Sequence, residues 1–172
     1  MLDLGTGSGA IACALAVELE GVRVVVGSDR SRPALEVARA NAARVGAERV
    51  AWVEADGLSA FGAGPVFDAI VCNPPYVAET ERSSLPAEVR DWEPAEALFA
   101  GPEGTETIAR VVRDAPAHLA ADGLLAIEIG DRQEPAVRRI VEQAPALELL
   151  GSYRDHAGRA RGVLALAIRR ET

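Results

Sequence analysis

The chain has 172 residues, of which 49% are hydrophobic and 26% are charged, a composition typical of one globular domain and unlike that of a disordered segment. Its net charge of −8 disfavours tight binding to a nucleic-acid backbone, which needs a positively charged surface. No apolar run has the length of a membrane span, and no secretory signal pattern begins the chain. We therefore expect a cytoplasmic protein with no membrane or direct nucleic-acid partner.

The two cysteines, Cys13 and Cys72, both lie in apolar segments. This placement is typical of small core residues in a protein of a reducing compartment. The two histidines, His118 and His156, have no ligand spacing that connects them to the cysteines. The sequence therefore predicts neither a disulfide nor a metal site.

A glycine-rich turn follows the first predicted strand, which covers only residues 1–4. The sequence there is Asp3-Leu4-Gly5-Thr6-Gly7-Ser8-Gly9, and a helix is expected from about Ala10 to Glu20. Glycines let the backbone approach a ligand closely, and the N–H groups that open the helix face that ligand. The G-x-G-x-G spacing after an acid differs from the dinucleotide G-x-G-x-x-G and is the form used for S-adenosylmethionine, which has no pyrophosphate.

The second predicted strand ends in an acidic residue. Residues 22–28 form an apolar run of the kind buried in a parallel sheet, and Asp29 follows it. An acid at this place in a doubly wound fold can accept hydrogen bonds from both ribose hydroxyls of a cofactor. The alternative is that Asp29 caps a helix that begins near Arg32 and Pro33 and ends at Val45.

The third predicted strand, residues 50–54, also leads to an acid, Asp56, which precedes Gly57. A carboxylate here can accept a hydrogen bond from an adenine amino group while a neighbouring group covers the ring. The alternative is a simple turn without a ligand. The order of strand, glycine loop, helix, strand and acid favours the ribose role of Asp29, and we favour the binding role over a simple turn at Asp56 as well.

The segment Asn73-Pro74-Pro75-Tyr76 follows the fourth predicted strand, residues 67–72. The prolines end the strand, because proline cannot donate a hydrogen bond within a sheet and holds the residue before it extended. A planar –NH2 group fits such a loop: the side-chain oxygen of Asn73 and the carbonyl of Pro74 accept its two hydrogens, and Tyr76 packs on its plane. The alternative is a rigid turn.

Residues 77–102 show no clear periodicity and are acidic, and a stretch of this length in a compact domain is often a lid or a binding loop. A helix is expected over residues 104–121, kinked or split by Pro116. The dipeptide Asp122-Gly123 then predicts a turn.

The rest of the chain decides the predicted fold class. A buried strand over residues 124–129 and a short helix over residues 135–143 precede two strands, residues 147–153 and 163–168. The connection between the last two is too short for a crossover helix, so this pair should be antiparallel. We therefore predict a Rossmann-like α/β fold of the class I S-adenosylmethionine-dependent methyltransferases, a mostly parallel seven-stranded sheet whose last strand is antiparallel.

These motifs give the chain a specific resemblance. It resembles the catalytic domain of the HemK-like glutamine N5-methyltransferases, which modify peptide-chain release factors. The resemblance extends from Leu2 to the last strand. It rests on residues 3–9, residues 73–76, Val89-Arg90-Asp91-Trp92-Glu93-Pro94 with Ala97-Leu98 and Gly101, Glu128-Ile129-Gly130 with Gln133, and Gly158-Arg159. The first two motifs are shared with many methyltransferases of amide or exocyclic nitrogen, and the others narrow the resemblance to this family.

The resemblance implies transfer of the sulfonium methyl group to the side-chain amide nitrogen of a glutamine in the Gly-Gly-Gln loop of a release factor. It also implies a role for each predicted site residue. The cofactor would be bound by the Asp3 motif with Gly5, Thr6, Gly7, Ser8 and Gly9, by Asp29, by Asp56 and Gly57, and by Asn73. The glutamine would be bound by Asn73, Pro74, Pro75 and Tyr76, with Asn73, Pro74 and Tyr76 as catalytic residues.

An amide nitrogen is a poor nucleophile because its lone pair is delocalised. Acceptors that fix both its hydrogens orient the nitrogen and favour the positive charge that develops on it. No strong base lies in the motif, so we expect catalysis by positioning, with late loss of the proton.

Two features depart from the family pattern. Its members carry a helical domain before the catalytic one, and Gly57 stands where relatives can have an aromatic residue that covers the adenine. We therefore expect residues 1–172 to be one methyltransferase domain with a shortened first strand, from a chain that is a fragment or whose start was assigned too late. The alternative functions are methylation of an adenine or guanine amino group in nucleic acid, with a flipped base stacked on Tyr76, and a non-catalytic binding module.

Overall fold

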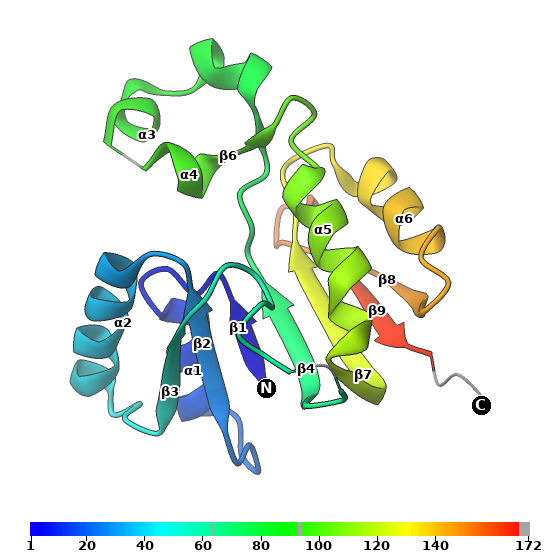
Figure 1. The fold of residues 1–172 in the computed structure, drawn as a ribbon. Helices are drawn as coiled ribbons and strands as arrows, with labels where there is room; N and C mark the ends of the chain where they lie inside the picture. The colour runs from blue at the N-terminus through cyan, green and yellow to red at the C-terminus, as the bar shows by residue number, and fades with distance from the viewer. Residues whose placement is uncertain (63, 93, 169–172) are drawn as a thin grey trace.

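The computed structural model describes residues 1–62, 64–92 and 94–168 and is organised around a seven-stranded sheet with the strand order β3-β2-β1-β4-β7-β9-β8 (Figure 1). The strands are β1 (Leu2–Leu4), β2 (Val25–Asp29), β3 (Val50–Glu54), β4 (Phe67–Cys72), β7 (Leu119–Glu128), β8 (Leu147–Arg154) and β9 (Ala160–Ala167). All neighbours pair in parallel except β9, which is antiparallel to both β7 and β8. The predicted fold class is confirmed.

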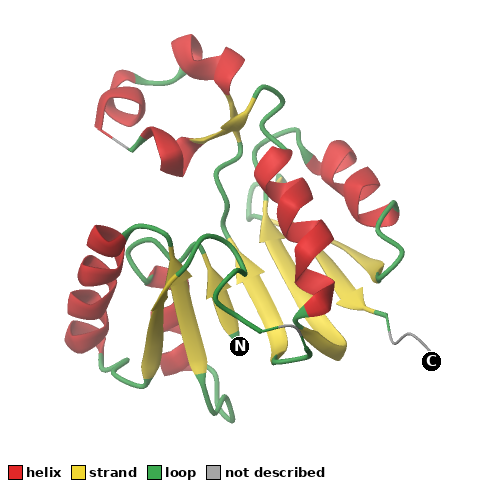
Figure 2. Ribbon diagram, viewed as in Figure 1, coloured by secondary structure: helices red, strands yellow, loops and turns green. Residues whose placement is uncertain are grey.

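Helices cover the two halves of this sheet (Figure 2). They are α1 (Ala10–Glu18), α2 (Arg32–Val45), α5 (Glu106–Asp114) and α6 (Glu134–Glu142). A smaller buried cluster joins α1 and α2 to β2 and β3, and a larger one joins α5 and α6 to β1, β4, β7, β8 and β9. Both cysteines are buried, which agrees with the prediction that they are core residues. None of the helices in the described part of the chain has the length and apolar character that a membrane crossing needs.

Residues 77–101 are more regular than the sequence predicts. Strands β5 (Val77–Ala78) and β6 (Phe99–Gly101) pair in parallel and enclose a 3₁₀ helix (Glu79–Ser84), α3 (Ala87–Trp92) and α4 (Ala95–Leu98). Together they form a lobe above the carboxyl ends of the sheet strands (Figure 1). The expectation of an irregular segment is wrong, because strands of two or three residues and helices of four to six residues leave no clear periodic pattern in a sequence. Within this segment, Glu93 lies outside the described residues.

Two other boundaries differ from the prediction. Helix α5 ends at Asp114, and a 3₁₀ helix over Ala115–Ala117 follows, so Pro116 does split the predicted helix. Strand β7 begins already at Leu119, and the dipeptide Asp122-Gly123 is an irregularity inside it. The φ of 61° at Asp122 shows that the backbone does turn there, but it stays in the sheet. The second strand begins three residues later than predicted, at Val25.

Candidate active site

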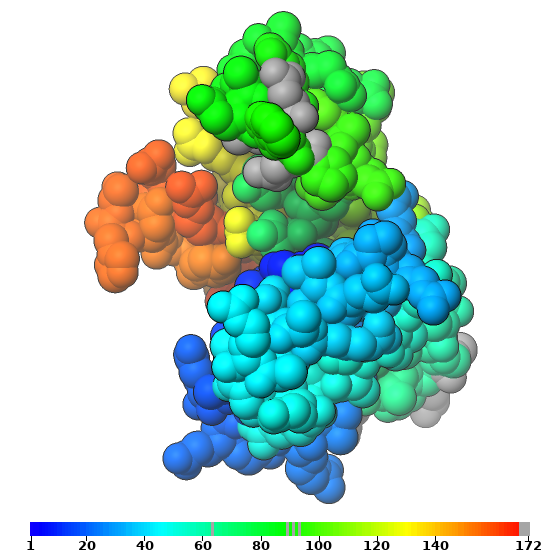
Figure 3. Space-filling view, turned by 90° about the vertical axis from the view of Figure 1, so that its left-hand side faces the viewer, coloured from blue at the N-terminus to red at the C-terminus, as the bar shows by residue number. Residues whose placement is uncertain are grey.

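The carboxyl ends of β2, β1 and β4 lie next to one another, with Leu4 paired to both Ser28 and Cys72. Ligands bind at such a place in a doubly wound sheet, where the loops of neighbouring strands leave in different directions. A cavity of about 350 Å³ opens there, between these loops and the lobe of residues 77–101. Figure 3 shows the hollow from the side of α2, with the lobe standing above it. The predicted residues that line it are Gly5, Gly7, Asp29, Asp56, Gly57, Asn73, Pro74 and Pro75.

The loop of residues 5–9, the glycine loop, is supported by Asp3, a residue that is 1% exposed. One carboxylate oxygen of Asp3 accepts hydrogen bonds from the hydroxyl of Thr6, at 2.5 Å, and from the backbone N–H of Ala12, at 2.9 Å. Burial raises the pKa of the Asp3 carboxyl, although both hydrogen bonds oppose that shift. Asp3 and Thr6 are thus both buried, and neither residue lines the cavity.

The glycines of this loop differ in what they contact. Gly5 and Gly7 have φ values of 72° and 55°, which favour glycine, and a Cβ at either would meet no atom within 4 Å. Their backbone is therefore open toward the cavity that they line. Gly9 instead packs against α2, since its Cβ would lie 2.9 Å from that of Ala38. Ser8 and Gly9 do not line the cavity, and their predicted contacts with a cofactor stay predictions.

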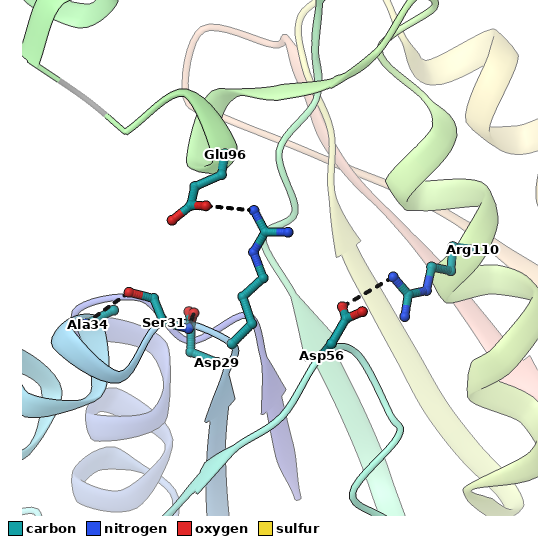
Figure 4. Close-up of polar contacts among 7 residues, drawn as sticks. Asp29, Ser31, Ala34, Asp56, Glu96 and Arg110 are labelled. Atoms are coloured by element: carbon teal, nitrogen blue, oxygen red, sulfur yellow. Dashed lines mark hydrogen bonds and ion pairs between the residues drawn. The ribbon is translucent and has the colours of Figure 1, made fainter.

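Asp29 connects the glycine loop to the start of α2. Its Oδ2 accepts a hydrogen bond from the N–H of Gly7 at 2.9 Å, and its Oδ1 accepts one from the N–H of Ser31 at 2.8 Å. The N-cap of α2 is Ser31, whose hydroxyl accepts from Ala34, so the capping role that the sequence left open for Asp29 belongs to Ser31 (Figure 4). Each carboxylate oxygen keeps a further lone pair, and Asp29 lines the cavity.

Asp56 is paired with a residue that the sequence analysis missed. Its Oδ1 accepts a hydrogen bond at 3.2 Å from Nη1 of Arg110, which comes from α5 (Figure 4). A Cβ at Gly57 would lie 3.1 Å from Nη2 of the same guanidinium, which therefore occupies the space beside this turn. Nothing local in the sequence connects Asp56 to Arg110, which lies 54 residues further along the chain.

A second missed pair joins the lobe to the sheet. Arg30, which follows β2, donates to Glu96 of α4 at 2.9 Å, and both line the cavity (Figure 4). The predicted role of residues 77–102 as a lid or binding loop pointed to this segment without identifying the residue. The pair spans 66 positions, so only the fold brings the two charges together.

The loop of residues 73–76, the Asn-Pro-Pro-Tyr loop, is divided between the cavity and the protein interior. Asn73 is exposed, and Asn73, Pro74 and Pro75 line the cavity. Tyr76 does not line it and packs against the larger core cluster, where its ring would meet a Cβ of Gly130 at 3.0 Å. The structure therefore brings three of the four predicted residues together, and stacking of Tyr76 on a substrate amide stays a prediction.

The glycine loop and the Asn-Pro-Pro-Tyr loop lie within the part of the chain that matches a known family. Residues 1–88 match the family model of the methyltransferase small domain. The chain belongs to the methyltransferase small domain family. This match covers β1 to the 3₁₀ helix after β5, and thus both loops that border the cavity.

Comparison with individual proteins agrees with this family. The chain is 36% identical over 162 residues to the release factor glutamine methyltransferase of Rhodopirellula baltica, which covers 94% of this chain and 54% of that protein. It is 40% identical over 141 residues to the ribosomal protein uL3 glutamine methyltransferase of Xanthomonas campestris pv. campestris, over 82% of this chain and 45% of that protein. The chain thus spans about half the length of these curated relatives.

The fold of this methyltransferase small domain is also found among solved structures. The ribosomal protein L11 methylase of Lactobacillus delbrueckii subsp. bulgaricus superposes with a TM-score of 0.69 at 21% identity, over 98% of this chain and 69% of that one. At this identity the likeness concerns the fold alone. The superposed 98% of this chain contains nearly all of its fold, which is built on the seven-stranded sheet with the antiparallel β9 between β7 and β8.

The cavity of this methyltransferase small domain fits S-adenosylmethionine in its chemistry. The open backbone of Gly5 and Gly7 admits the amino-acid part of a ligand, and the carboxylates of Asp29 and Asp56 lie along the same cavity as hydrogen-bond acceptors. In addition, Oδ1 of Asp3 is buried and has no hydrogen-bond partner within the described residues. A buried, unpaired carboxylate oxygen beneath the loop favours a positively charged group above it.

Proposed function

We propose that this chain transfers the methyl group of S-adenosylmethionine to the side-chain amide nitrogen of a glutamine in a peptide-chain release factor. One observation carries the proposal: the glycine loop after β1 and the Asn-Pro-Pro-Tyr loop after β4 border one cavity. The last residues of these two strands, Leu4 and Cys72, are paired in the sheet, so the loops leave from adjacent places. A cofactor loop and an amide-binding loop are thus within reach of each other, as group transfer requires.

The first step that the residues perform is binding of the cofactor. When bound, S-adenosylmethionine supplies a methyl group on a positively charged sulfur. Among the residues that line the cavity, Gly5 and Gly7 would present backbone to its amino-acid part, Asp29 would accept from the ribose hydroxyls, and the turn at Asp56 would border the adenine. The guanidinium of Arg110 beside Gly57 offers a flat surface for that ring, in the place of an aromatic side chain.

The second step is orientation of the substrate amide. The side-chain oxygen of Asn73 and the carbonyl of Pro74 accept the two hydrogens of the –NH2 group and turn its nitrogen toward the methyl group. In the transfer, the N–C bond would form as the S–C bond breaks, so the positive charge would move from sulfur to nitrogen and strengthen both hydrogen bonds. The demethylated cofactor would then leave as a neutral thioether, and the nitrogen would lose its proton to water. Burial raises the pKa of the Cys72 thiol beside this loop, so the thiol stays protonated and is no nucleophile for an intermediate on the protein.

The substrate class follows from the relatives and from charge. Relatives that match the chain over most of its length are named glutamine methyltransferases of a release factor or of ribosomal protein uL3. Acidic residues outnumber basic ones by 26 to 18, which favours a protein substrate over a nucleic-acid backbone. We therefore propose a release factor as the substrate, with ribosomal protein uL3 as the second candidate.

Methyl transfer from labelled S-adenosylmethionine tests the proposal directly. The chain is incubated with a purified release factor, with the same factor carrying Gln→Ala in its Gly-Gly-Gln loop, with uL3 and with RNA. Label on the wild-type factor alone is the expected result. Label on uL3 alone or on RNA alone would show that this molecule, and not the release factor, is the substrate. If calorimetry detects cofactor binding but no label appears on any of the molecules, the proposed reaction is contradicted.

A further inference from the structure

Gln133 lies where three backbone segments meet. It directly precedes α6, and its backbone carbonyl accepts a hydrogen bond from the N–H of Val137 at 3.0 Å, which fixes its main chain. Its side-chain Oε1 accepts from the N–H of Gly130 at 2.9 Å. Its Nε2 donates to the carbonyl oxygens of Tyr76, at 2.8 Å, and of Gly104, at 3.1 Å. Both N–H groups of the side-chain amide are therefore used.

Two glycines make the space for this arrangement. A Cβ at Gly130 would lie 2.9 Å from Oε1 of Gln133 and 3.0 Å from Cδ2 of Tyr76. A Cβ at Gly104 would lie 2.7 Å from the carbonyl oxygen of Tyr76 and 3.1 Å from Nε2 of Gln133. These distances are shorter than ordinary carbon contacts, so the amide and the tyrosine fill the site closely.

The consequence is that the Asn-Pro-Pro-Tyr loop is anchored at both ends. At one end Cys72 is paired with Ile127 in the sheet, and at the other the carbonyl of Tyr76 is bound by Gln133. Between these anchors two proline rings fix two φ angles. A short loop that is anchored at both ends and stiff in the middle keeps the backbone of Asn73 and Pro74 in one place at the cavity that both residues line.

We propose that Gln133 is a positioning residue for methyl transfer, which holds the Asn-Pro-Pro-Tyr loop in the geometry that accepts the substrate amide. This inference rests on the proposed function and names a residue that acts on it from outside the cavity, since Gln133 is not among the lining residues. Loss of the Gln133 side-chain amide should therefore leave the residues that line the cofactor part of the cavity in place. It should change the direction of the two proposed acceptors, the side-chain oxygen of Asn73 and the carbonyl of Pro74. Transfer rates respond steeply to such a change, because a displacement of about 1 Å can cost about 10²-fold.

The variant Gln133→Glu tests this role. Glutamate has the same length and keeps an acceptor for Gly130, but it lacks both N–H donors and places a negative charge beside two carbonyl oxygens. We expect kcat toward the release factor to fall about 10- to 100-fold, while KM and the cofactor dissociation constant change less than about threefold. Gln143→Glu is the matched control, because it makes the same charge change at an exposed position at the other end of α6.

Hydrogen exchange supplies a readout that needs no substrate. In Gln133→Glu, the backbone amides of residues 76–80 and 104–106 should exchange faster, and in Gln143→Glu they should not. Wild-type kcat together with wild-type exchange in Gln133→Glu would overturn the inference. If the wild-type chain transfers no methyl group, the proposed function fails and exchange alone decides whether Gln133 anchors the loop. If Gln133→Glu does not fold, Gln133→Met takes its place, with the same length and no charge.

Discussion

The two loops that border the cavity are made rigid in opposite ways. The glycine loop contains residues with positive φ and is held by Asp3 from only three residues before Thr6. The Asn-Pro-Pro-Tyr loop has its φ angles limited by proline and is held by Gln133, which lies 57 residues from Tyr76. One loop presents its backbone to a ligand, and the other presents a side-chain amide and a carbonyl.

The difference matches what each loop is proposed to do. A cofactor with many polar atoms can be bound by backbone groups spread over several residues, so a small shift of one group is tolerated. Alignment of a nitrogen with a methyl group allows little error, so the acceptors need a stiff frame with a distant anchor. We therefore expect changes in the first loop to affect binding and stability, and changes in the second to affect the rate of transfer.

The largest expected effect comes from Asn73→Ala. It removes one of the two proposed acceptors, so kcat should fall by about 10²-fold or more, as for loss of one preorganised group at a developing charge. The cofactor dissociation constant should stay within about twofold, because Asp29 and the glycine backbone are unchanged. Labelled methyl transfer and calorimetry measure the two quantities. Near-full turnover of this variant would show that the amide is not bound by Asn73.

Asp3→Ala breaks the support of the first loop. The hydroxyl of Thr6 and the N–H of Ala12 lose their buried acceptor, and a buried unpaired group costs about 1–3 kcal/mol. We expect the free energy of unfolding to fall by about 2 kcal/mol in urea denaturation, with weaker cofactor binding. Thr6→Val serves as the control, because it removes one of the two donors and should cost less. Equal free energies of unfolding of Asp3→Ala and the wild type would show that Asp3 does not stabilise the glycine loop.

Asp29→Ala removes a residue that lines the cavity and also joins Gly7 to the start of α2. Loss of the ribose acceptors should raise the cofactor dissociation constant about tenfold, which corresponds to about 1.4 kcal/mol. Ser31→Ala removes the cap of α2 and leaves the carboxylate in place, so it separates helix stability from cofactor binding. An unchanged dissociation constant in Asp29→Ala would reduce Asp29 to a structural link between the loop and the helix.

The smallest effect is expected for Arg30→Gln, which removes the ion pair between the lobe and the sheet. Both side chains are more than half exposed, at 54% and 56%, and exposed pairs contribute at most about 1 kcal/mol. The cofactor dissociation constant should rise about two- to threefold at low salt, and the difference should vanish at high salt because of screening. Glu96→Gln should give the same change. A tenfold effect of either variant would show that the pair closes the cavity.

The sequence alone predicted the features whose residues are close together along the chain. Asp3 and the glycines follow one another, the prolines end β4, and Asp29 is the last residue of β2, so spacing was sufficient to identify them. The antiparallel β9 followed from a connection too short for a helix. The pairs Asp56–Arg110 and Arg30–Glu96 and the β5–β6 ladder were not predictable in this way, because their partners come from distant segments.

The sequence by itself thus determined the order of the strands in the main sheet and of helices α1, α2, α5 and α6, the two loops and eight of the residues that line the cavity, because backbone geometry and local hydrogen bonding depend on neighbouring residues. Only the tertiary structure decided the direction of each side chain. It turned Asp3 and Tyr76 inward, brought Arg110 beside Gly57 and placed Gln133 against the carbonyl of Tyr76. These orientations depend on packing between segments that spacing along the chain does not describe.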